Sequence, residues 1–248
     1  MTDEEALKKY DPRANCPRER LNAVHRVAND FDFLVPVETL AAKCRAKVGT
    51  EQYDRLLWLY TMAYKIGRPK ALVVEAAVEA VDAETVRVGG VEIVSPFVRA
   101  KLLQSPVAYA YLLTCGQEVE EWSRTLTDIV DVFYVDELKK LWLGCAENAV
   151  RAEVRKRLAP DALLSSLNPG SLPQWPIEGQ RELFRILCDT EGTVGVCLTD
   201  SCLMLPSKSV SGLLFQDHSG HVNCALCPRE NCPNRRVPYR TNVNACIL

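Results

Sequence analysis

The sequence lacks the features that mark membrane, secreted and nucleic-acid-binding proteins. No apolar run approaches the roughly 18 residues that cross a bilayer, and the first thirty residues are charged throughout, without the apolar core of a signal peptide. Lys and Arg number 30 against 32 Asp and Glu, so the formal net charge of -2 leaves no surplus of cations for phosphate. We therefore expect a cytoplasmic protein that binds neither membranes nor nucleic acids.

Common nucleotide-binding and nucleophile motifs are also missing. Neither G-x-G-x-x-G nor G-x4-G-K-[ST] occurs, and no G-x-S-x-G elbow is present. The sequence has no internal repeat or low-complexity tract. Its 48% hydrophobic and 25% charged residues are ordinary for one large or two small globular domains, so composition alone does not indicate a function.

Cysteine, in contrast, is plentiful and unevenly placed. Seven of the eleven cysteines fall at or after Cys188, and three of them form the pattern Cys224-x2-Cys227-x4-Cys232. A chain without a secretion signal favours reduced thiols, metal ligands or redox groups over a disulfide framework. Three thiolates within nine residues are close enough to hold one metal centre, and the nearby arginines favour an anionic one.

Hydrophobic periodicity and turn residues predict the elements along the chain. Strands are expected at 107–114, as a hairpin of 85–88 and 91–94 about Gly89-Gly90, and as an apolar pair carrying Cys197 and Cys202. A Pro- and Gly-rich loop is expected at 166–176. Helices are expected at 18–29, 37–47, 50–66, 70–81, between Pro96 and Pro106, and at 118–124, 133–158 and 178–187.

The run from Gly195 to Gly212 contains Leu-Thr-Asp-Ser, Met-x-Pro and Ser-Val-Ser-Gly, and it follows Asn-Pro-Gly at 168–170 and Trp-Pro at 175–176. This combination resembles the activation (reactivation) domain of cobalamin-dependent methionine synthase, above all its free-standing bacterial homologues with a C-terminal cysteine cluster. The resemblance implies an α+β fold with a twisted, mainly antiparallel sheet and flanking helices. It divides the chain into a helical N-terminal extension (1–48), an activation-domain-like core (49–215) and a cysteine-rich metal-binding segment (216–248).

In the family this domain binds S-adenosylmethionine. The resemblance places candidate cofactor-binding residues in the Pro-Gly loop and on one face of the last long strand: Asn168, Pro169, Gly170, Ser171, Ser209 and Ser211. The family has an Arg before Pro-Gly and a Tyr just after it, and this chain has Ser166 and Ser171 at or near those places. A serine does not replace the charged fork with which an arginine grips a carboxylate, so this departure weakens the case for S-adenosylmethionine.

The predicted metal site needs a fourth ligand beside Cys224, Cys227 and Cys232. Cys202 is the preferred candidate, because the chain after Ser211 is long enough to return to it; the alternatives are Cys197, Cys246, His218 and His221. The spacing fits a [4Fe-4S] cluster and zinc alike. The implied function favours iron–sulfur, since zinc carries no electron.

The resemblance thus implies an accessory protein that reductively activates a corrinoid-dependent methyltransferase by passing one electron to Co(II). The chain has no Asp-x-His-x-x-Gly cobalamin-binding box, so the corrinoid is expected on a partner protein, with a further protein as electron donor. Two alternatives stay open: a zinc-stabilised interaction module on the same fold, and an S-adenosylmethionine-dependent remethylation component.

Overall fold

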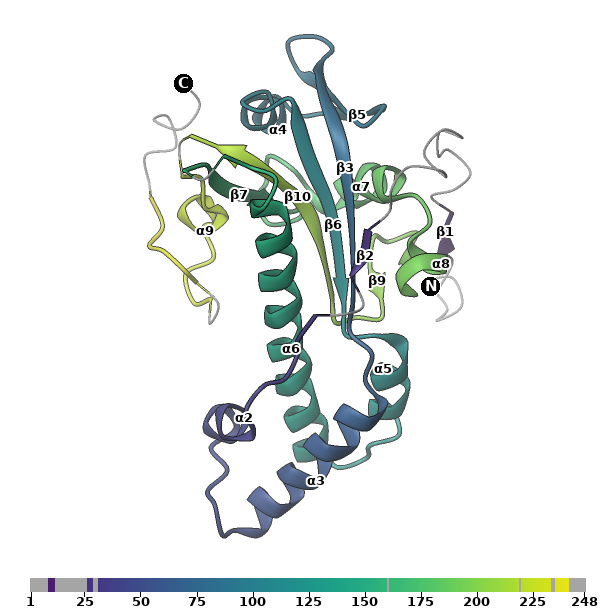
Figure 1. Cartoon of the computed structure of the whole chain (residues 1–248), viewed down its shortest axis with the longest axis vertical. Coiled ribbons are helices and arrows are strands. Elements are labelled where there is room, and N and C mark those ends of the chain that lie inside the picture. Colours follow the sequence, from purple (N-terminus) through teal and green to yellow (C-terminus); the bar gives the residue numbers. More distant parts are fainter. Residues whose placement is uncertain are drawn as a thin grey trace.

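An antiparallel sheet forms the centre of the protein (Figure 1). The computed structural model describes residues 9–11, 26–28, 31–159, 161–218, 220–232 and 235–240. Within this part of the chain the main strand order is β5-β4-β3-β6-β10-β7, and β2 also pairs with β3. The strands are β2 (Arg26–Ala28), β3 (Lys70–Ala80), β4 (Thr85–Val88), β5 (Val91–Val94), β6 (Val107–Thr114), β7 (Leu163–Leu167) and β10 (Ser209–Asp217).

The two faces of this sheet bury alternate side chains of the same strands. Along β6, Ala110 and Leu112 belong to one apolar cluster, whereas Tyr111 and Leu113 belong to another, as the period-2 geometry of a strand requires. The first cluster includes residues of α4 (Pro96–Leu102) and α7 (Gln180–Leu187). The second includes the C-terminal half of α6 (Ile129–Arg155). Helices therefore cover both faces of the sheet.

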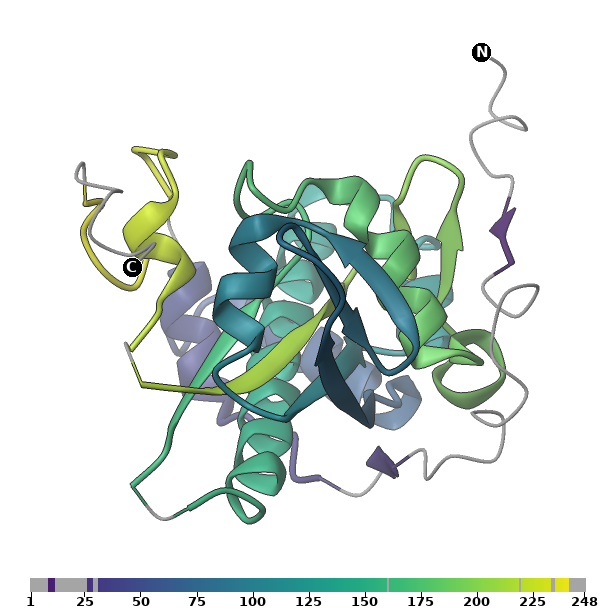
Figure 2. The same cartoon turned by 90° about the horizontal axis from the view of Figure 1, so that it is seen from above.

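A small second sheet lies beside the main one. It has the order β1-β8-β9, formed by β1 (Lys9–Tyr10), β8 (Cys197–Thr199) and β9 (Met204–Leu205). The segment that leads into it comprises η3 (Ile177–Gly179), α7 and the short α8 (Thr190–Val194). This green segment and the yellow segment with α9 (Asn223–Leu226) lie on opposite sides of the molecule (Figures 1 and 2).

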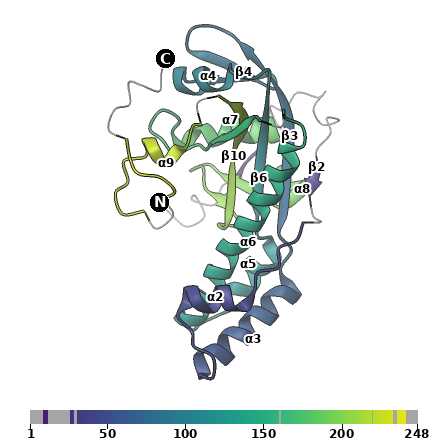
Figure 3. The same ribbon diagram turned by 60° about the vertical axis from the view of Figure 1, so that its left-hand side comes forward.

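A helical arm projects from one end of the sheet (Figures 1 and 3). It consists of α2 (Val37–Cys44), α3 (Glu51–Ile66), α5 (Gln117–Ser123) and the N-terminal half of α6. Helix α3 begins where the Thr50 hydroxyl accepts the amide proton of Tyr53 and ends at Gly67. With 27 residues, α6 is about 40 Å long at about 1.5 Å per residue, so it runs from the arm tip to the sheet. None of the described helices combines the length and apolarity that a bilayer crossing requires.

A buried ion pair within the arm and two contacts from the segment between β9 and β10 join the arm to the strands. The Lys139 ammonium of α6 lies 3.0 Å from a carboxylate oxygen of Glu120 in α5 and donates to the Ser123 hydroxyl at 2.9 Å. Ser207, between β9 and β10, donates to the other Glu120 oxygen at 3.3 Å. Next to it, Lys208 pairs with Asp136 of α6 at 2.8 Å. These bonds fix the direction in which the arm leaves the sheet.

Two of the predicted helices are wrong. The stretch 70–81 is not a helix but the central strand β3, whose Leu72, Val74 and Ala76 share one face of the sheet. Residues 26–28 of the predicted helix 18–29 form β2, and the rest of that range lies outside the described residues. In each case pairing or packing with a distant segment outweighs local propensity.

Cys202, Cys224, Cys227 and Cys232 form no disulfide, whereas Cys188 is disulfide-bonded. Cys16 and Cys246 lie outside the described residues. The predicted division of the chain at residues 48 and 215 stays a prediction.

Candidate functional site

The Pro-Gly loop follows β7 directly and is held as a tight turn. The amide of Gly170 donates to the Trp175 carbonyl at 2.9 Å, and that of Ser171 donates to the Asn168 carbonyl at 3.1 Å. Gly170 has a φ of +79°, and a Cβ on it would lie 2.8 Å from Cδ1 of Ile177. Both constraints require glycine here, and Pro169 beside it is buried.

Asn168 is the centre of a hydrogen-bond network that links three strands to the C-terminal segment. Its Nδ2 donates to the Tyr111 hydroxyl of β6 at 2.6 Å and to the Ser211 carbonyl of β10 at 2.7 Å. Its Oδ1 accepts from Nδ2 of Asn223 at 3.1 Å, and the Asn223 Oδ1 lies 2.8 Å from Nε2 of His221. Burial raises the pKa of Tyr111 to about 12, against the opposing effect of the Asn168 hydrogen bond, so its phenol keeps its proton at neutral pH.

The serines predicted on β10 are buried and already bonded within the protein. The Ser211 hydroxyl donates to Oε1 of Gln180 in α7 at 2.8 Å, and the Ser209 hydroxyl donates to the Pro206 carbonyl at 2.8 Å. Only Ser211 adjoins the Asn168 network, through its carbonyl. Ser209 lies two residues before Ser211, at the first position of β10, where it pairs with Thr114 of β6.

Sequence reasoning missed a guanidinium beside Ser166. Arg151 of α6 donates from Nη2 to the Ser166 hydroxyl at 3.1 Å and from Nη1 to the Leu164 carbonyl at 3.4 Å. Its Nε pairs with Glu147 at 2.9 Å, and Arg236 of the C-terminal segment pairs with the same carboxylate at 3.1 Å. The helix therefore brings a positive charge to the strand position where the sequence shows only a serine. Fifteen residues separate Arg151 from Ser166, so no local motif could reveal the pairing.

Gly212 allows the close approach of β10 to this network. A Cβ at this position would lie 2.6 Å from the Leu167 carbonyl oxygen and would also collide with Nδ2 of Asn168. We expect Gly212→Ala to lower the free energy of unfolding by about 1–3 kcal/mol, because the added methyl has no space against backbone. Urea unfolding checks this value, and Gly144→Ala is the control, since nothing lies within 4 Å of the added Cβ there. An unchanged midpoint for Gly212→Ala would contradict the expectation.

The C-terminal segment is fixed to the sheet through His221 and Asp217. The Asp217 carboxylate accepts from the His221 amide and from the Ser165 hydroxyl, the latter at 2.9 Å. The Ser165 hydroxyl also lies 2.9 Å from the His221 carbonyl oxygen, so the two acceptors share its one proton. The imidazole lies edge-to-face with Phe97 at 5.8 Å between centroids. Burial lowers the pKa of His221 below its usual 6.5, so the folded protein favours the neutral ring.

The fixation of this segment is therefore expected to weaken in acid. Above about pH 6.5 the ring is neutral in both folded and unfolded chains, whereas below it the unfolded chain binds a proton that the folded site resists. Hydrogen exchange at residues 221–226 should speed up between about pH 7.5 and about pH 5.5, after correction for intrinsic rates. His221→Gln should remove this extra acceleration and His218→Gln should keep it. Equal acceleration in both variants would contradict the assignment to His221.

The predicted thiolate ligands lie in a loop organised around Arg235. Its guanidinium donates to the carbonyls of Cys224 at 2.8 Å, Cys227 at 3.1 Å and Arg229. Cys224 belongs to α9, and Cys227 follows it directly. The backbone of the loop thus converges on one cation.

The structure does not assemble the predicted metal site. Among the residues it describes, no three His, Cys, Asp or Glu side chains are grouped so that they could hold one metal ion. Cys202 is buried in the turn between β8 and β9. Cys197 is buried in β8, and His221 is engaged as described above. The donor set therefore does not fit one centre in this conformation, and the metal site stays a prediction.

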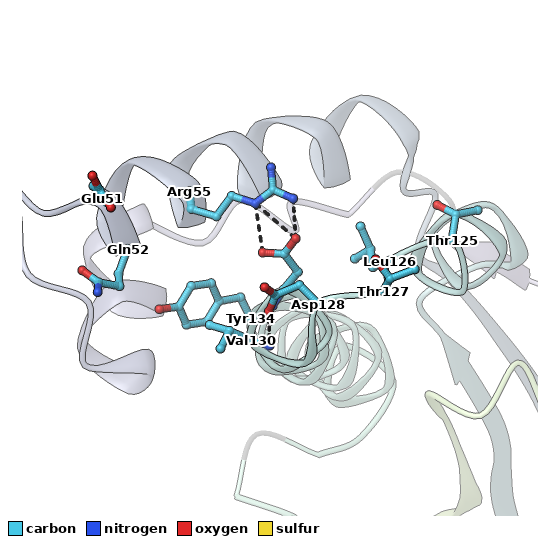
Figure 4. Close-up of a pocket in the computed structure, with 10 residues that line it drawn as sticks. Glu51, Gln52, Arg55, Thr125, Leu126, Thr127, Asp128, Val130 and Tyr134 are labelled. Atoms are coloured by element: carbon cyan, nitrogen blue, oxygen red, sulfur yellow. Dashed lines mark hydrogen bonds and ion pairs between the residues drawn. The ribbon is translucent and has the colours of Figure 1, made fainter.

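A pocket of about 530 Å³ lies far from this network, in the helical arm (Figure 4). Arg55 reaches across it from α3 and donates from Nε to Oδ1 of Asp131 in α6 at 2.9 Å, while Nη2 pairs with the other oxygen. The lining residues are Glu51, Gln52, Arg55, Thr125, Leu126, Thr127, Asp128, Val130, Asp131 and Tyr134.

Comparison with known proteins identifies the fold. No protein-family model and no curated protein matches the sequence. A solved structure described as the MetH reactivation domain bound to AdoHcy matches with a TM-score of 0.50 and 16% identity. The match covers 90% of this chain and 88% of that one. This chain has the fold of the methionine synthase reactivation domain.

The match confirms two predictions from the sequence: the resemblance to the reactivation domain, and an α+β fold with an antiparallel sheet and flanking helices. At 16% identity over nearly the whole chain, the match shows shared architecture alone. The motifs that carried the resemblance lie in the Pro-Gly loop, in β8 and β9, and at the start of β10.

Proposed function

We propose that this protein assists the reactivation of a corrinoid-dependent methyltransferase. The observation that carries the proposal is the match to a methionine synthase reactivation domain along 90% of this chain and 88% of the other. The corrinoid arrives on the partner, since this sequence contains no cobalamin-binding box.

The test is a reactivation assay with a corrinoid methyltransferase from the same organism. The partner is prepared anaerobically with its cobalt as Co(II), and loss of the Co(II) spectrum is followed with a chemical reductant, with and without this protein. Acceleration at substoichiometric amounts supports the proposal. An unchanged rate at equimolar protein would refute it.

S-adenosylmethionine is the candidate methyl donor, because the structurally similar domain was crystallised with AdoHcy. When bound, it would supply a methyl group for the corrinoid. Arg151 beside Ser166 is the residue of this chain that would hold its carboxylate, with the Asn168–Ser171 turn beside it. Arg151 is also engaged by Glu147, so binding must compete with that ion pair.

Titration calorimetry with S-adenosylmethionine tests this assignment. Arg151→Ala is expected to weaken binding by about tenfold or more, since a charge-assisted contact contributes roughly 1.5–3 kcal/mol. Arg155→Ala, an exposed position one turn later on α6, is the matched control and should bind as the wild type does. If the wild type does not bind S-adenosylmethionine, the remethylation role is refuted. The proposed delivery of an electron to Co(II) is unaffected by that result.

Electron delivery through a cysteine-ligated iron–sulfur cluster is the finer form of the proposal. Cys224, Cys227 and Cys232 would be its ligands, with Cys202 or another donor completing the set. The described geometry does not group these thiols. The site would therefore need a rearranged C-terminal loop, and we derive no electron-transfer step through it.

Metal analysis of anaerobically purified protein decides between the candidates. Stoichiometric iron with visible charge-transfer absorption supports the cluster, and both should be lost in Cys227→Ser but not in Cys145→Ser, a change in α6. Stoichiometric zinc without visible absorption instead supports a zinc-stabilised interaction module, which chelators should destabilise. Protein that contains neither metal would refute both forms.

A further inference from the structure

The tip of the helical arm exposes apolar side chains that no described segment covers. Of the fifteen large hydrophobic residues that are exposed in the described chain, six lie on α3 and the first turn of α6. Ile129 is 83% exposed and Trp58 is 46% exposed. The others are Leu57, Val130, Val132 and Phe133. Six exposed large apolar residues on two paired helices exceed the isolated ones expected on an ordinary surface.

The two helices that carry these residues are locked together at the pocket of Figure 4. Arg55 pairs with the buried Asp131, and the ring of Trp58 lies 4.5 Å from the Arg55 guanidinium carbon. Trp58 and Arg55 thus lie together on α3, next to the first turn of α6. Trp and Arg are the residue types that most often dominate binding energy at protein interfaces. Because the ion pair already orders Arg55, binding loses less side-chain entropy.

Apolar and acidic groups together line the pocket. Val130, Leu126 and Tyr134 provide apolar lining for an inserted side chain. Glu51 lies in the first turn of α3. Asp128 is the N-cap of α6, where its Oδ1 accepts from the Val130 and Asp131 amides, and no described cation forms an ion pair with either carboxylate. Since Arg55 and Asp131 neutralise each other, the pocket retains negative charge. That charge attracts Lys and Arg and disfavours an anionic bilayer.

We infer that the arm tip is a docking surface for a partner protein segment that inserts an apolar side chain next to Lys or Arg. The inference rests on the proposed function in one respect: the partner to be tested is the corrinoid-bearing methyltransferase. The arm tip lies at the N-terminus of α6, and Arg151, which contacts Ser166 next to the Pro-Gly loop, lies about 33 Å along the helix from Ile129 at about 1.5 Å per residue. Docking at the arm therefore leaves the Pro-Gly loop uncovered.

The experiment measures binding of the full chain to the corrinoid methyltransferase by surface plasmon resonance, together with hydrogen exchange of the complex. The variant I129S/F133S removes two exposed apolar groups, and Val94→Ser, at a 74% exposed residue of β5, is the matched control. We expect about a tenfold or greater loss of affinity for I129S/F133S and none for Val94→Ser. Glu51→Lys should lower affinity and reduce its dependence on salt. Protection on binding is expected at residues 51–58 and 126–133.

The outcomes separate this inference from the proposed function. If the wild type does not bind the methyltransferase, both fail. If the wild type binds, but I129S/F133S binds equally and the arm gains no protection, only the docking surface is refuted. Loss of self-association in I129S/F133S without loss of methyltransferase binding would assign the surface to a second copy of this chain. Wild-type binding to vesicles of phosphatidylcholine and phosphatidylserine that I129S/F133S abolishes would assign it to membranes. Either of these results overturns the inference.

Discussion

Replacing Glu120 by alanine is expected to lower the free energy of unfolding by about 3–5 kcal/mol, because it leaves the charge of Lys139 buried and unpaired. The Lys139 side chain is only 7% exposed, and Glu120 is its one carboxylate partner in the described chain. The Ser123 hydroxyl contacts the ammonium but carries no compensating charge. A surface pair of the same length would be worth far less.

A charge-free replacement of the pair separates lost pairing from lost packing. E120Q/K139M is expected to be more stable than Glu120→Ala, since it leaves no buried charge behind. Urea unfolding gives both values. A double variant as unstable as Glu120→Ala would show that shape, rather than the uncompensated ammonium, sets the cost.

Cys115 offers a local probe of the same junction. Its Sγ donates to the Lys139 carbonyl at 3.1 Å, and burial raises its pKa to about 12. The native thiol should therefore resist alkylation at neutral pH, because the thiolate is the nucleophile. Glu120→Ala should speed its alkylation if the junction opens locally. An unchanged rate at Cys115 alongside a large loss of global stability would place the damage elsewhere.

The helices and turns with strong local signals are those that the sequence predicts well. Thr50 as N-cap, the aromatic and leucine spacing after it and Gly67 at the end define α3 almost completely. The Gly89-Gly90 pair gives the β4–β5 hairpin, and both glycines adopt positive φ. In these segments the residues that set the conformation are neighbours in sequence.

The central strand β3 shows where that approach fails. Its sequence, Lys-Ala-Leu-Val-Val-Glu-Ala-Ala-Val-Glu-Ala, is rich in alanine, so helix propensity is high and apolar residues occupy nearly every position. Period alone does not distinguish a buried strand from a buried helix in such a run. The structure decides it through pairing, because β6 lies along eight residues of β3 from Lys70 to Ala77.

The candidate site was predictable only in part, because contacts between segments distant in sequence assemble it. The motifs marked Asn168 and Gly170, and the structure shows that both are required by the geometry of the loop. Tyr111, Arg151 and Asn223 join them only because β6, α6 and the C-terminal segment converge on β7 and β10. The cysteine spacing predicts metal ligands, but spacing does not specify whether the side chains of a loop meet.

The second large effect is expected from Trp142→Ala, which should lower the free energy of unfolding by about 3–5 kcal/mol. Trp142 is fully buried where α6 crosses the end of α3. Phe33 and Tyr64 lie edge-on to its ring, with centroids 5.5 and 5.1 Å away. A Cβ on Gly67 would lie 2.5 Å from the ring, so the structure has no free space between Gly67 and the indole. Truncation therefore leaves a cavity that its neighbours fill poorly.

Trp142→Phe is the informative companion, because the indole Nε1 is buried and has no hydrogen-bond partner among the residues that the structure describes. Phenylalanine removes this unsatisfied donor while keeping most of the ring, so we expect a loss well below that of alanine. Chemical denaturation measures both variants, and hydrogen exchange of α3 shows whether the arm loosens before the sheet. If the phenylalanine variant were as unstable as the alanine variant, the shape of the indole would matter more than cavity volume. The arm would then owe its position to that one ring.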